Sequence, residues 1–162
     1  MSEQDYSATV RVAAAKDEVF LALTTLDGLS AWWTPATGDP TTGGVITFTF
    51  GPHGAAVMRV DQADRDAGVR WTTLECLVED WVGTSQQFEL TALPGGGTEI
   101  RFRHVGLTPE LECYGDCKNG WDHFVDSLTV YVETGTGNPN GSDADARRRE
   151  LRAATKVAAG AA

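Results

Sequence analysis

TEIRFRHVGLTPELECYGDCKNGWDHFVDSLTVYVET, residues 98–134, is the stretch of this sequence that decides its fold. Its first eight residues alternate in character and place Ile100, Phe102 and His104 on one face of a predicted strand. From Pro109 onward, apolar residues recur every three or four positions, which predicts one long helix with a single apolar stripe. The stripe consists of Cys113, Cys117, Trp121, Phe124, Leu128 and Val132. A strand with an apolar face, followed at once by such a helix, predicts that the helix covers a sheet.

The residues upstream of this stretch supply the other strands of that sheet. Alternating runs of high β propensity predict strands at residues 46–50, 56–61, 69–78 and 84–93. Short turns rich in Gly and Pro separate these runs, and such turns favour consecutive antiparallel hairpins. The sheet is therefore predicted to be an antiparallel meander.

The N-terminal part of the chain adds one more strand and two short helices. Residues 6–12 alternate weakly and predict the first strand, and the apolar spacing after Asp17 predicts a helix with that residue as its N-cap. Gly28 should interrupt this helix, residues 29–33 should form a second one, and residues 35–44 should form a loop. The predicted fold is α+β, of the helix-grip type. It has a curved antiparallel sheet of about six strands, two short helices after strand 1 and a long C-terminal helix packed over the sheet.

Several short motifs, taken in order, are similar to those of a known family. They are EVF at 18–20 followed by Trp32-Trp33, WVGT at 81–84 followed by FEL at 88–90, RFRHVGL at 101–107, ECYGDC at 112–117 followed by Trp121, and GNPN at 137–140. The chain resembles the AHSA1-like (activator of Hsp90 ATPase homologue-like) subgroup of the SRPBCC, START or Bet v 1-like superfamily over roughly residues 5 to 141. Gly120 departs from the subgroup, which often has a better helix former there. The resemblance implies a Bet v 1-like fold with an internal cavity. It implies no particular activity, because the superfamily includes lipid and hormone binders, aromatase/cyclases and a co-chaperone domain.

Composition and charge limit the classes of partner. The 162 residues favour one domain, and the formal net charge of −10 should repel phosphate backbones and anionic lipid surfaces. We therefore expect no nucleic acid and no membrane as partner. The N-terminus has no basic region followed by an apolar run, so we expect a cytoplasmic protein without a secretory signal.

The last residues differ in composition from the rest. Residues 1–140 are predicted to form the helix-grip domain, and residues 141–162 a tail that is polar, then rich in Ala and Arg, and flexible or partly helical. The basic cluster at 147–149 is interpreted as a solvated helix face. Because the tail has little apolar surface to bury, we expect it to be dispensable for folding.

The candidate ligand site lies between the sheet and the long helix. Alternation along the strands and the stripe of the helix predict a cavity lined by Phe48, Phe88, Ile100, Phe102, His104, Cys117, Trp121, Phe124 and Leu128. The expected ligand is a small apolar or aromatic molecule, which tryptophan side chains could also stack against. His104 could orient a polar group of the ligand, or could simply be hydrogen-bonded within the core. No cofactor, metal or catalytic residue is predicted.

The cysteines of the helix leave alternatives open. Cys113 and Cys117, with His104, could offer ligands to zinc, and the two thiols could form a redox pair. The favoured interpretation is that both are reduced, metal-free and buried as small hydrophobic residues of the stripe.

Three classes of function fit this sequence. The first is a binding module that encloses a small apolar or aromatic molecule. The second is a cyclase- or hydratase-like enzyme that uses the same cavity, with His104 as the one nameable ionisable group. The third is a protein-interaction or chaperone-partner domain. Binding is favoured over catalysis, and a homodimer is left open.

Overall fold

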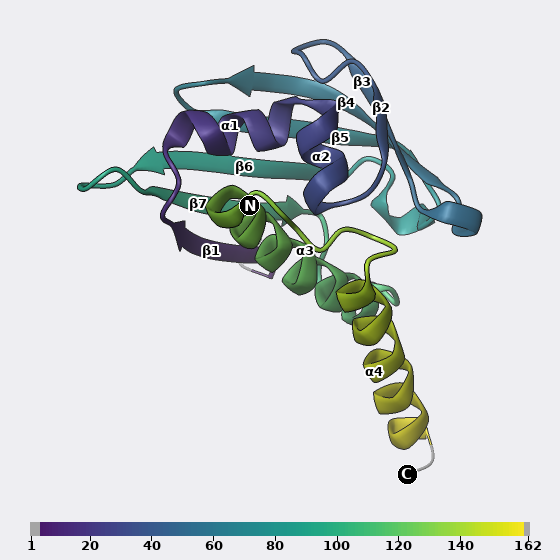
Figure 1. Cartoon of the computed structure of the whole chain (residues 1–162). Coiled ribbons are helices and arrows are strands. Elements are labelled where there is room, and N and C mark those ends of the chain that lie inside the picture. Colours follow the sequence, from purple (N-terminus) through teal and green to yellow (C-terminus); the bar gives the residue numbers. More distant parts are fainter. Residues whose placement is uncertain (1–3, 161–162) are drawn as a thin grey trace.

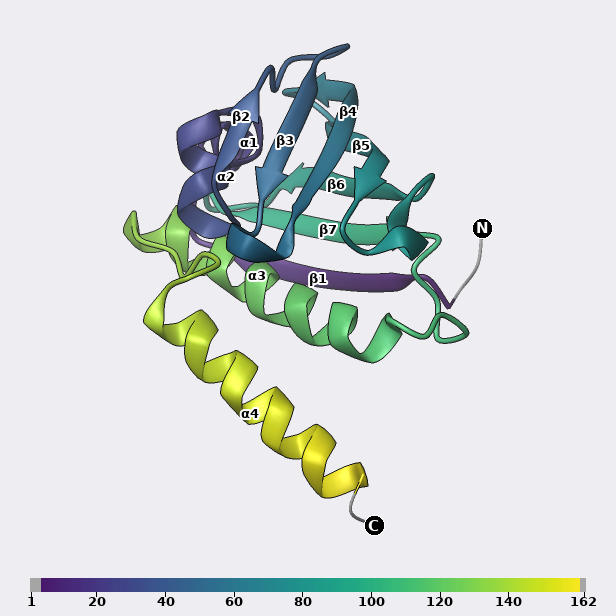
Figure 2. The same ribbon diagram turned by 90° about the vertical axis from the view of Figure 1, so that its right-hand side faces the viewer.

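Seven antiparallel strands form one strongly curved sheet across residues 4–160, the part of the chain that the computed structural model describes (Figures 1 and 2). The strand order is β1-β7-β6-β5-β4-β3-β2. The strands are β1 (Tyr6–Val12), β2 (Ala36–Gly38), β3 (Val45–Thr49), β4 (Ala55–Asp64), β5 (Gly68–Cys76), β6 (Ser85–Ala92) and β7 (Thr98–Val105). The predicted α+β helix-grip fold is confirmed, with six strands close to their expected positions.

The seventh strand, β2, lies where a loop was predicted. It has three residues and pairs with β3, with Ala36 opposite Phe48 and Gly38 opposite Ile46. Gly38 has φ 111°, and a Cβ there would lie 2.2 Å from the carbonyl oxygen of Val45. Glycine is therefore required for the close approach of the two backbones. Three residues rich in Thr and Gly are too short to show a period of two, so the pattern could not predict this strand.

Alternation places the large side chains of the strands on one face of the sheet. Phe88 of β6 lies opposite Phe102 of β7, and Gln86 lies opposite His104 in the same two strands. All four side chains are buried. The concave face therefore carries both an aromatic layer and a small set of polar groups.

Two short helices cover one end of this face: α1 (Lys16–Thr24) and α2 (Leu26–Trp32) (Figure 1). The expected cap and break are both wrong. Ala15 is the N-cap of α1 and Asp17 lies in the first turn, while the break falls at Thr25, whose extended backbone also begins α2. Gly28 lies inside α2, where its N–H donates to the Thr25 side chain at 3.0 Å. A Cβ at Gly28 would lie 2.9 Å from the Cα of Ala22, so the glycine permits tight packing of α2 on α1.

The long helix α3 (Tyr114–Thr134) lies along β1 and β7 (Figure 2). The Tyr6 hydroxyl joins β1 to this helix by donating to Asp122 at 2.6 Å. The helix begins five residues later than predicted, because the backbone from Thr108 to Tyr114 makes two successive i→i+3 hydrogen bonds of the 3₁₀ type. The helix ends at Gly135, which adopts φ 90° as the left-handed C-cap.

The last residues form a further helix, α4 (Asp143–Gly160), which turns back along α3 and diverges from it (Figure 2). Two short 3₁₀ helices, η1 (Gly51–His53) and η2 (Glu79–Trp81), join β3 to β4 and β5 to β6. Within residues 4–160, no helix has the length and apolar character needed to cross a bilayer.

Candidate functional site

Aromatic rings fill the space between the sheet and α3. Ring centroids lie 4.3 Å apart for Trp33 and Phe48, 5.0 Å for Trp33 and Trp121, and 4.4 Å for Phe102 and Trp121. Phe88 packs on Phe102 at 4.7 Å. Side chains therefore occupy the middle of the predicted cavity.

The molecule does have a pocket, at the edge of this aromatic core. It has a volume of about 470 Å³, within the range typical of small-molecule sites. Its floor consists of apolar residues from α3, from the loops after β3 and β5, and from the end of α2: Trp33, Phe50, Cys76, Leu77, Val78, Trp81, Cys117, Trp121 and Phe124. Its opposite wall is α4. The pocket is thus a partly open space between the aromatic core and α4.

The nine residues predicted to bind ligand separate into two groups. All nine are buried in the same core, but of these only Cys117, Trp121 and Phe124 line the pocket. The other six lie in the packed interior: Phe48, Phe88, Ile100, Phe102, His104 and Leu128. The stripe of α3 therefore continues from the core to the pocket.

His104 is hydrogen-bonded within the core and does not line the pocket. Trp121 Nε1–H donates to its Nδ1 at 2.9 Å, so the ring proton is on Nε2, which faces Thr84 Oγ1 at 2.7 Å. Burial lowers the pKa of His104 from its ordinary value to about 3. The ring is therefore neutral at physiological pH. Trp81 lies between it and the pocket, with its ring centroid 4.6 Å from that of His104.

The three thiols gather near the pocket, but not as the stripe suggested. Cys117 is buried and accepts a hydrogen bond from Trp81 Nε1–H at 3.2 Å. Cys113 lies at the N-cap position of α3 and packs against the core, but it is only half-buried, so the expectation that it is buried like Cys117 is wrong. Burial raises the pKa of Cys117 to about 12 and also raises the pKa values of Cys76 and Cys113. Among the described residues no group of three or more His, Cys, Asp or Glu side chains is arranged to hold a metal ion.

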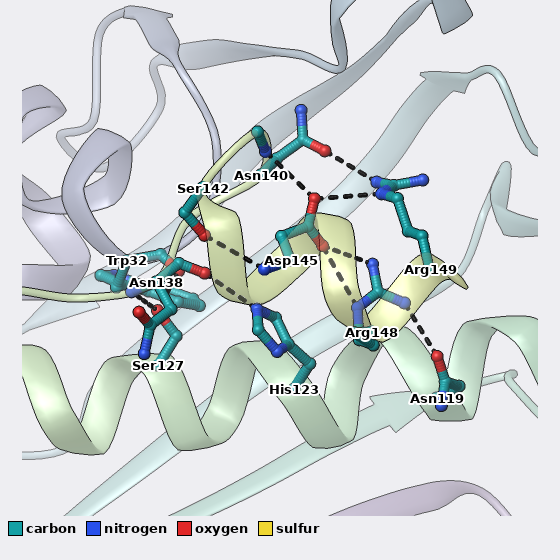
Figure 3. Close-up of polar contacts among 11 residues, drawn as sticks. Trp32, Asn119, His123, Ser127, Asn138, Asn140, Ser142, Asp145, Arg148 and Arg149 are labelled. Carbon is teal, nitrogen blue, oxygen red and sulfur yellow. Dashed lines mark hydrogen bonds and ion pairs between the residues drawn. The ribbon is translucent and has the colours of Figure 1, made fainter. Parts of the chain in front are cut away.

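The segment that leads into α4 is fixed to the core by hydrogen bonds to α3 and α2 (Figure 3). Ser127 Oγ donates to the carbonyl of Trp32 at 2.7 Å and accepts from the N–H of Asn138 at 2.7 Å. His123 donates to the carbonyl of Asn138 at 2.9 Å, and Asn140 N–H donates to the carbonyl of Trp33. The start of α4 is therefore positioned by buried groups.

Asp145 organises the first turns of α4 (Figure 3). Its buried carboxylate accepts from the Gly141 N–H at 3.0 Å, from Arg148 at 2.6 Å and from Arg149 at 3.0 Å, while its own N–H donates to Ser142 Oγ. Burial alone would raise the pKa of Asp145, but these hydrogen bonds outweigh burial and hold it below its usual range. Ser142 and Asp145 have the spacing of a capping box, a signal in the sequence that could have located this helix start.

A second carboxylate tethers the later turns. Asp116 of α3 accepts from Arg152 at 2.9 Å and from Lys156 at 3.0 Å. The Lys156 ammonium is the main reason that the pKa of Asp116 lies below its usual range. Arg148, Arg149, Arg152 and Lys156 all line the pocket, and sequence reasoning missed them. The interpretation of 147–149 as a solvated face fits Arg147 and Arg149, which are exposed, but not Arg148, whose side chain is only 15% exposed.

The fold and the pocket define a class of protein: a helix-grip domain with a space for a small molecule beside its long helix. Comparison with family models places it more narrowly. Residues 13–133 match the model of the activator of Hsp90 ATPase homolog 1-like proteins (AHSA1), and the chain belongs to this family. A comparison with curated proteins finds no match.

Solved structures with the same fold include two with more than a quarter of their residues identical. The Aha1 dimer from Colwellia psychrerythraea is 28% identical with a TM-score of 0.72, over 82% of this chain and 98% of that one. DynU16, a putative protein in the dynemicin biosynthetic locus, is 27% identical with a TM-score of 0.64, over 84% of this chain. This chain spans about half of DynU16, 49% of its length.

CalU16 from Micromonospora echinospora is 20% identical with a TM-score of 0.64, over 91% of this chain and 83% of that one. At that level of identity the likeness is evidence for the fold alone.

Proposed function

We propose that this protein reversibly binds a small apolar or aromatic molecule in the pocket between the aromatic core and α4. The observation that carries this proposal is the pocket itself, about 470 Å³ in volume and floored by Trp33, Trp81, Trp121 and Phe124. A ligand that removed about 300 Å² of apolar surface from water there would gain roughly 7 kcal/mol before the cost of immobilising it. Without that cost, 7 kcal/mol corresponds to a dissociation constant of about 10 μM, so we expect affinities weaker than this for a small probe, on the order of 0.1–1 mM.

The chemistry of the walls favours binding over catalysis. Cys76 and Cys117 line the pocket as thiols whose raised pKa keeps them protonated at neutral pH, and a protonated thiol is a poor nucleophile. His104, the ionisable group on which an enzymatic role was based, is neutral and lies behind Trp81. The walls therefore supply shape and apolar surface, and little of what acid–base chemistry needs.

Cellular location and assembly are part of the same proposal. Three free cysteines support a cytoplasmic protein. A homodimer is supported by the Aha1 relative, which was solved as a dimer. Sedimentation velocity over a range of protein concentrations tests it, and a monomer throughout would contradict it.

A neutral aromatic probe tests the site. We expect 2-naphthylmethanol to bind with a dissociation constant on the order of 0.1–1 mM in calorimetry and to change the fluorescence of the lining tryptophans. Gly120 faces the pocket from α3, and a Cβ at this position would meet nothing within 4 Å, so Gly120→Leu should fill the space without clashing and reduce affinity at least tenfold. Ala154→Leu, at an exposed position of α4 outside the pocket, is the matched control.

Two results would overturn the proposal. One is the absence of binding by apolar and aromatic probes, charged or neutral, at millimolar concentration. The other is binding that Gly120→Leu does not weaken, which would place the ligand elsewhere.

A further inference from the structure

We propose that the ligand is a monoanion, an aromatic or alkyl carboxylate, whose charged group is held by the basic side chains of α4. This inference rests on the proposed function and specifies the ligand class of the same pocket. Four cations line one wall: Arg148, Arg149, Arg152 and Lys156. The other side is mainly apolar, although His53, Asp116 and Asn119 also line the pocket, so the site suits a molecule with an apolar body and one charged group.

Counting charges shows that these cations are only half neutralised. Arg148 and Arg149 share the single carboxylate of Asp145, and Arg152 and Lys156 share that of Asp116. Four positive charges against two negative charges leave two positive charges beside the pocket. Each pair of cations could therefore accept one more anionic group without building up negative charge.

The cations nearest the open side keep donors available for a ligand. The Arg152 side chain contacts Asp116 through Nε, and the Arg152 and Lys156 side chains remain 32% and 54% exposed. A guanidinium and an ammonium together offer several N–H groups beyond those that Asp116 can accept. A ligand carboxylate beside these two side chains could accept from their remaining donors while Asp116 keeps its own hydrogen bonds.

The positive charge beside the pocket contrasts with the negative charge of the rest of the chain. The chain as a whole has a net charge of −10, so an anion finds few favourable regions on its surface. A polyanion such as a nucleoside triphosphate would exceed the two residual charges and meet the repulsion of the whole chain. A monoanion with an apolar body matches both the charge and the floor.

Three probes of equal ring size test the inference by calorimetry at pH 7.5: 2-naphthoate, 2-naphthylmethanol and 2-naphthylmethylammonium. We expect naphthoate to bind about tenfold more tightly than the alcohol, equivalent to about 1.4 kcal/mol, and the ammonium more weakly than either. The preference for naphthoate should decrease as salt is raised, because the cations are partly exposed.

Charge-removing variants assign the preference to α4. Lys156→Gln and Arg152→Gln should each reduce naphthoate affinity about three- to fivefold more than they reduce the affinity for the alcohol. Arg147→Gln removes the same charge from the same helix at an exposed position outside the pocket, and should change neither. Because Lys156 is exposed, its variant should fold normally, and melting curves of all three variants check this.

The outcomes separate the two proposals. Binding of no probe would overturn the proposed function. Equal binding of alcohol and carboxylate, or a preference for the carboxylate that survives both Lys156→Gln and Arg152→Gln, would overturn the monoanion inference and leave the proposed function standing.

Discussion

His104 makes the stability of this protein depend on pH through a single buried ring. Its folded-state pKa is lowered to about 3, whereas an unfolded histidine has a pKa of about 6.5. Between these values the unfolded chain binds a proton that the folded chain does not. The free energy of unfolding should therefore fall as pH drops from about 6.5 toward 3, by up to about 1.4 kcal/mol per pH unit.

Urea unfolding at several pH values between 7.5 and 4.5 measures this contribution. His104→Gln should be less stable than the wild type at pH 7.5. Below pH 6 the difference between their free energies of unfolding should decrease by roughly 1 kcal/mol for each pH unit. Phe88→Leu, a change in the same core that adds no titrating group, should lower stability by a similar amount at every pH. Parallel pH profiles for the wild type and His104→Gln would contradict the assignment of a lowered pKa to this ring.

Gly120 links helix stability to the volume of the pocket. It lies inside α3, where glycine is less favourable than alanine by about 1 kcal/mol, and a Cβ there would meet nothing within 4 Å. Gly120→Ala should therefore raise the free energy of unfolding by about 0.5–1 kcal/mol, and the melting temperature by a few degrees. Because the added methyl group points into the pocket, the variant should also bind 2-naphthylmethanol no more tightly than the wild type. A lower melting temperature would show that the backbone at this position needs glycine.

The helix α4 is held by polar contacts, and Asp145 is the centre of the first set. Asp145→Ala removes acceptors from Gly141, Arg148 and Arg149, and leaves Arg148, whose side chain is only 15% exposed, without its carboxylate. Because α4 contacts α3 mainly through polar side chains, we expect local opening of α4 to increase more than the global free energy of unfolding falls. Trypsin should cut the Arg147–Arg149 region about tenfold faster, while the melting temperature changes by only a few degrees. As a control, trypsin should cut the variant Asp143→Ala, which is changed at an exposed position in the same first turn, at the wild-type rate.

Truncation separates the part of α4 that docks from the part that does not. The sequence suggested that everything beyond Gly141 is dispensable, but Asp145, Arg148 and Arg152 all contact α3 or the segment before α4. Residues 157–159 are exposed. Ending the chain after Lys156 should change the melting temperature by less than about 1 °C, whereas ending it after Gly141 should lower it measurably. Equal melting temperatures for the two truncations would show that the α4 contacts contribute no net stability.

The elements that sequence predicted well are those whose burial repeats along the chain. β7 alternates between buried and less buried residues, and the buried residues of α3 include Cys117, Trp121, Phe124 and Leu128, so each pattern follows from one sheet face and one helix stripe. The start of α3 was placed too early because the residues after Pro109 follow the helical spacing but make 3₁₀ turns. Periodicity reports which side chains face inward, not the local hydrogen-bond pattern that holds them.

The pocket was harder to predict than the core. Sequence identified the inward-facing residues, but whether they leave a space depends on how Trp33, Trp71 and Trp121 fill it, and ring packing is set by the tertiary structure. The cations of α4 were missed for a related reason. Their role depends on Asp116, which lies more than thirty residues earlier in the chain and was treated as part of a different element.

At the scale of the whole molecule, the pocket lies between α4 and the rest of the domain. Its floor belongs to the sheet, α2 and α3, and its cationic wall belongs to α4. A ligand with an apolar ring against Trp81 and Trp121 and a carboxylate beside Arg152 would contact both. Binding should therefore stabilise the docked position of α4 as well as the fold.

Hydrogen exchange and melting curves with 2-naphthoate test this coupling. At about 100 times its dissociation constant, the probe should stabilise the fold by roughly 2.7 kcal/mol and raise the melting temperature by about 5–11 °C. Amides of residues 145–156 and of the first half of α3 should exchange more slowly, whereas those of β1, on the opposite side of α3, should change only through global stability. In the chain ended after Gly141 the probe loses its charged wall, so 2-naphthoate should stabilise it no more than 2-naphthylmethanol does. If 2-naphthoate and 2-naphthylmethanol slowed exchange in α4 equally, the apolar ring alone would account for the stabilisation of α4. The basic side chains would then serve only to hold α4 to Asp116 and Asp145.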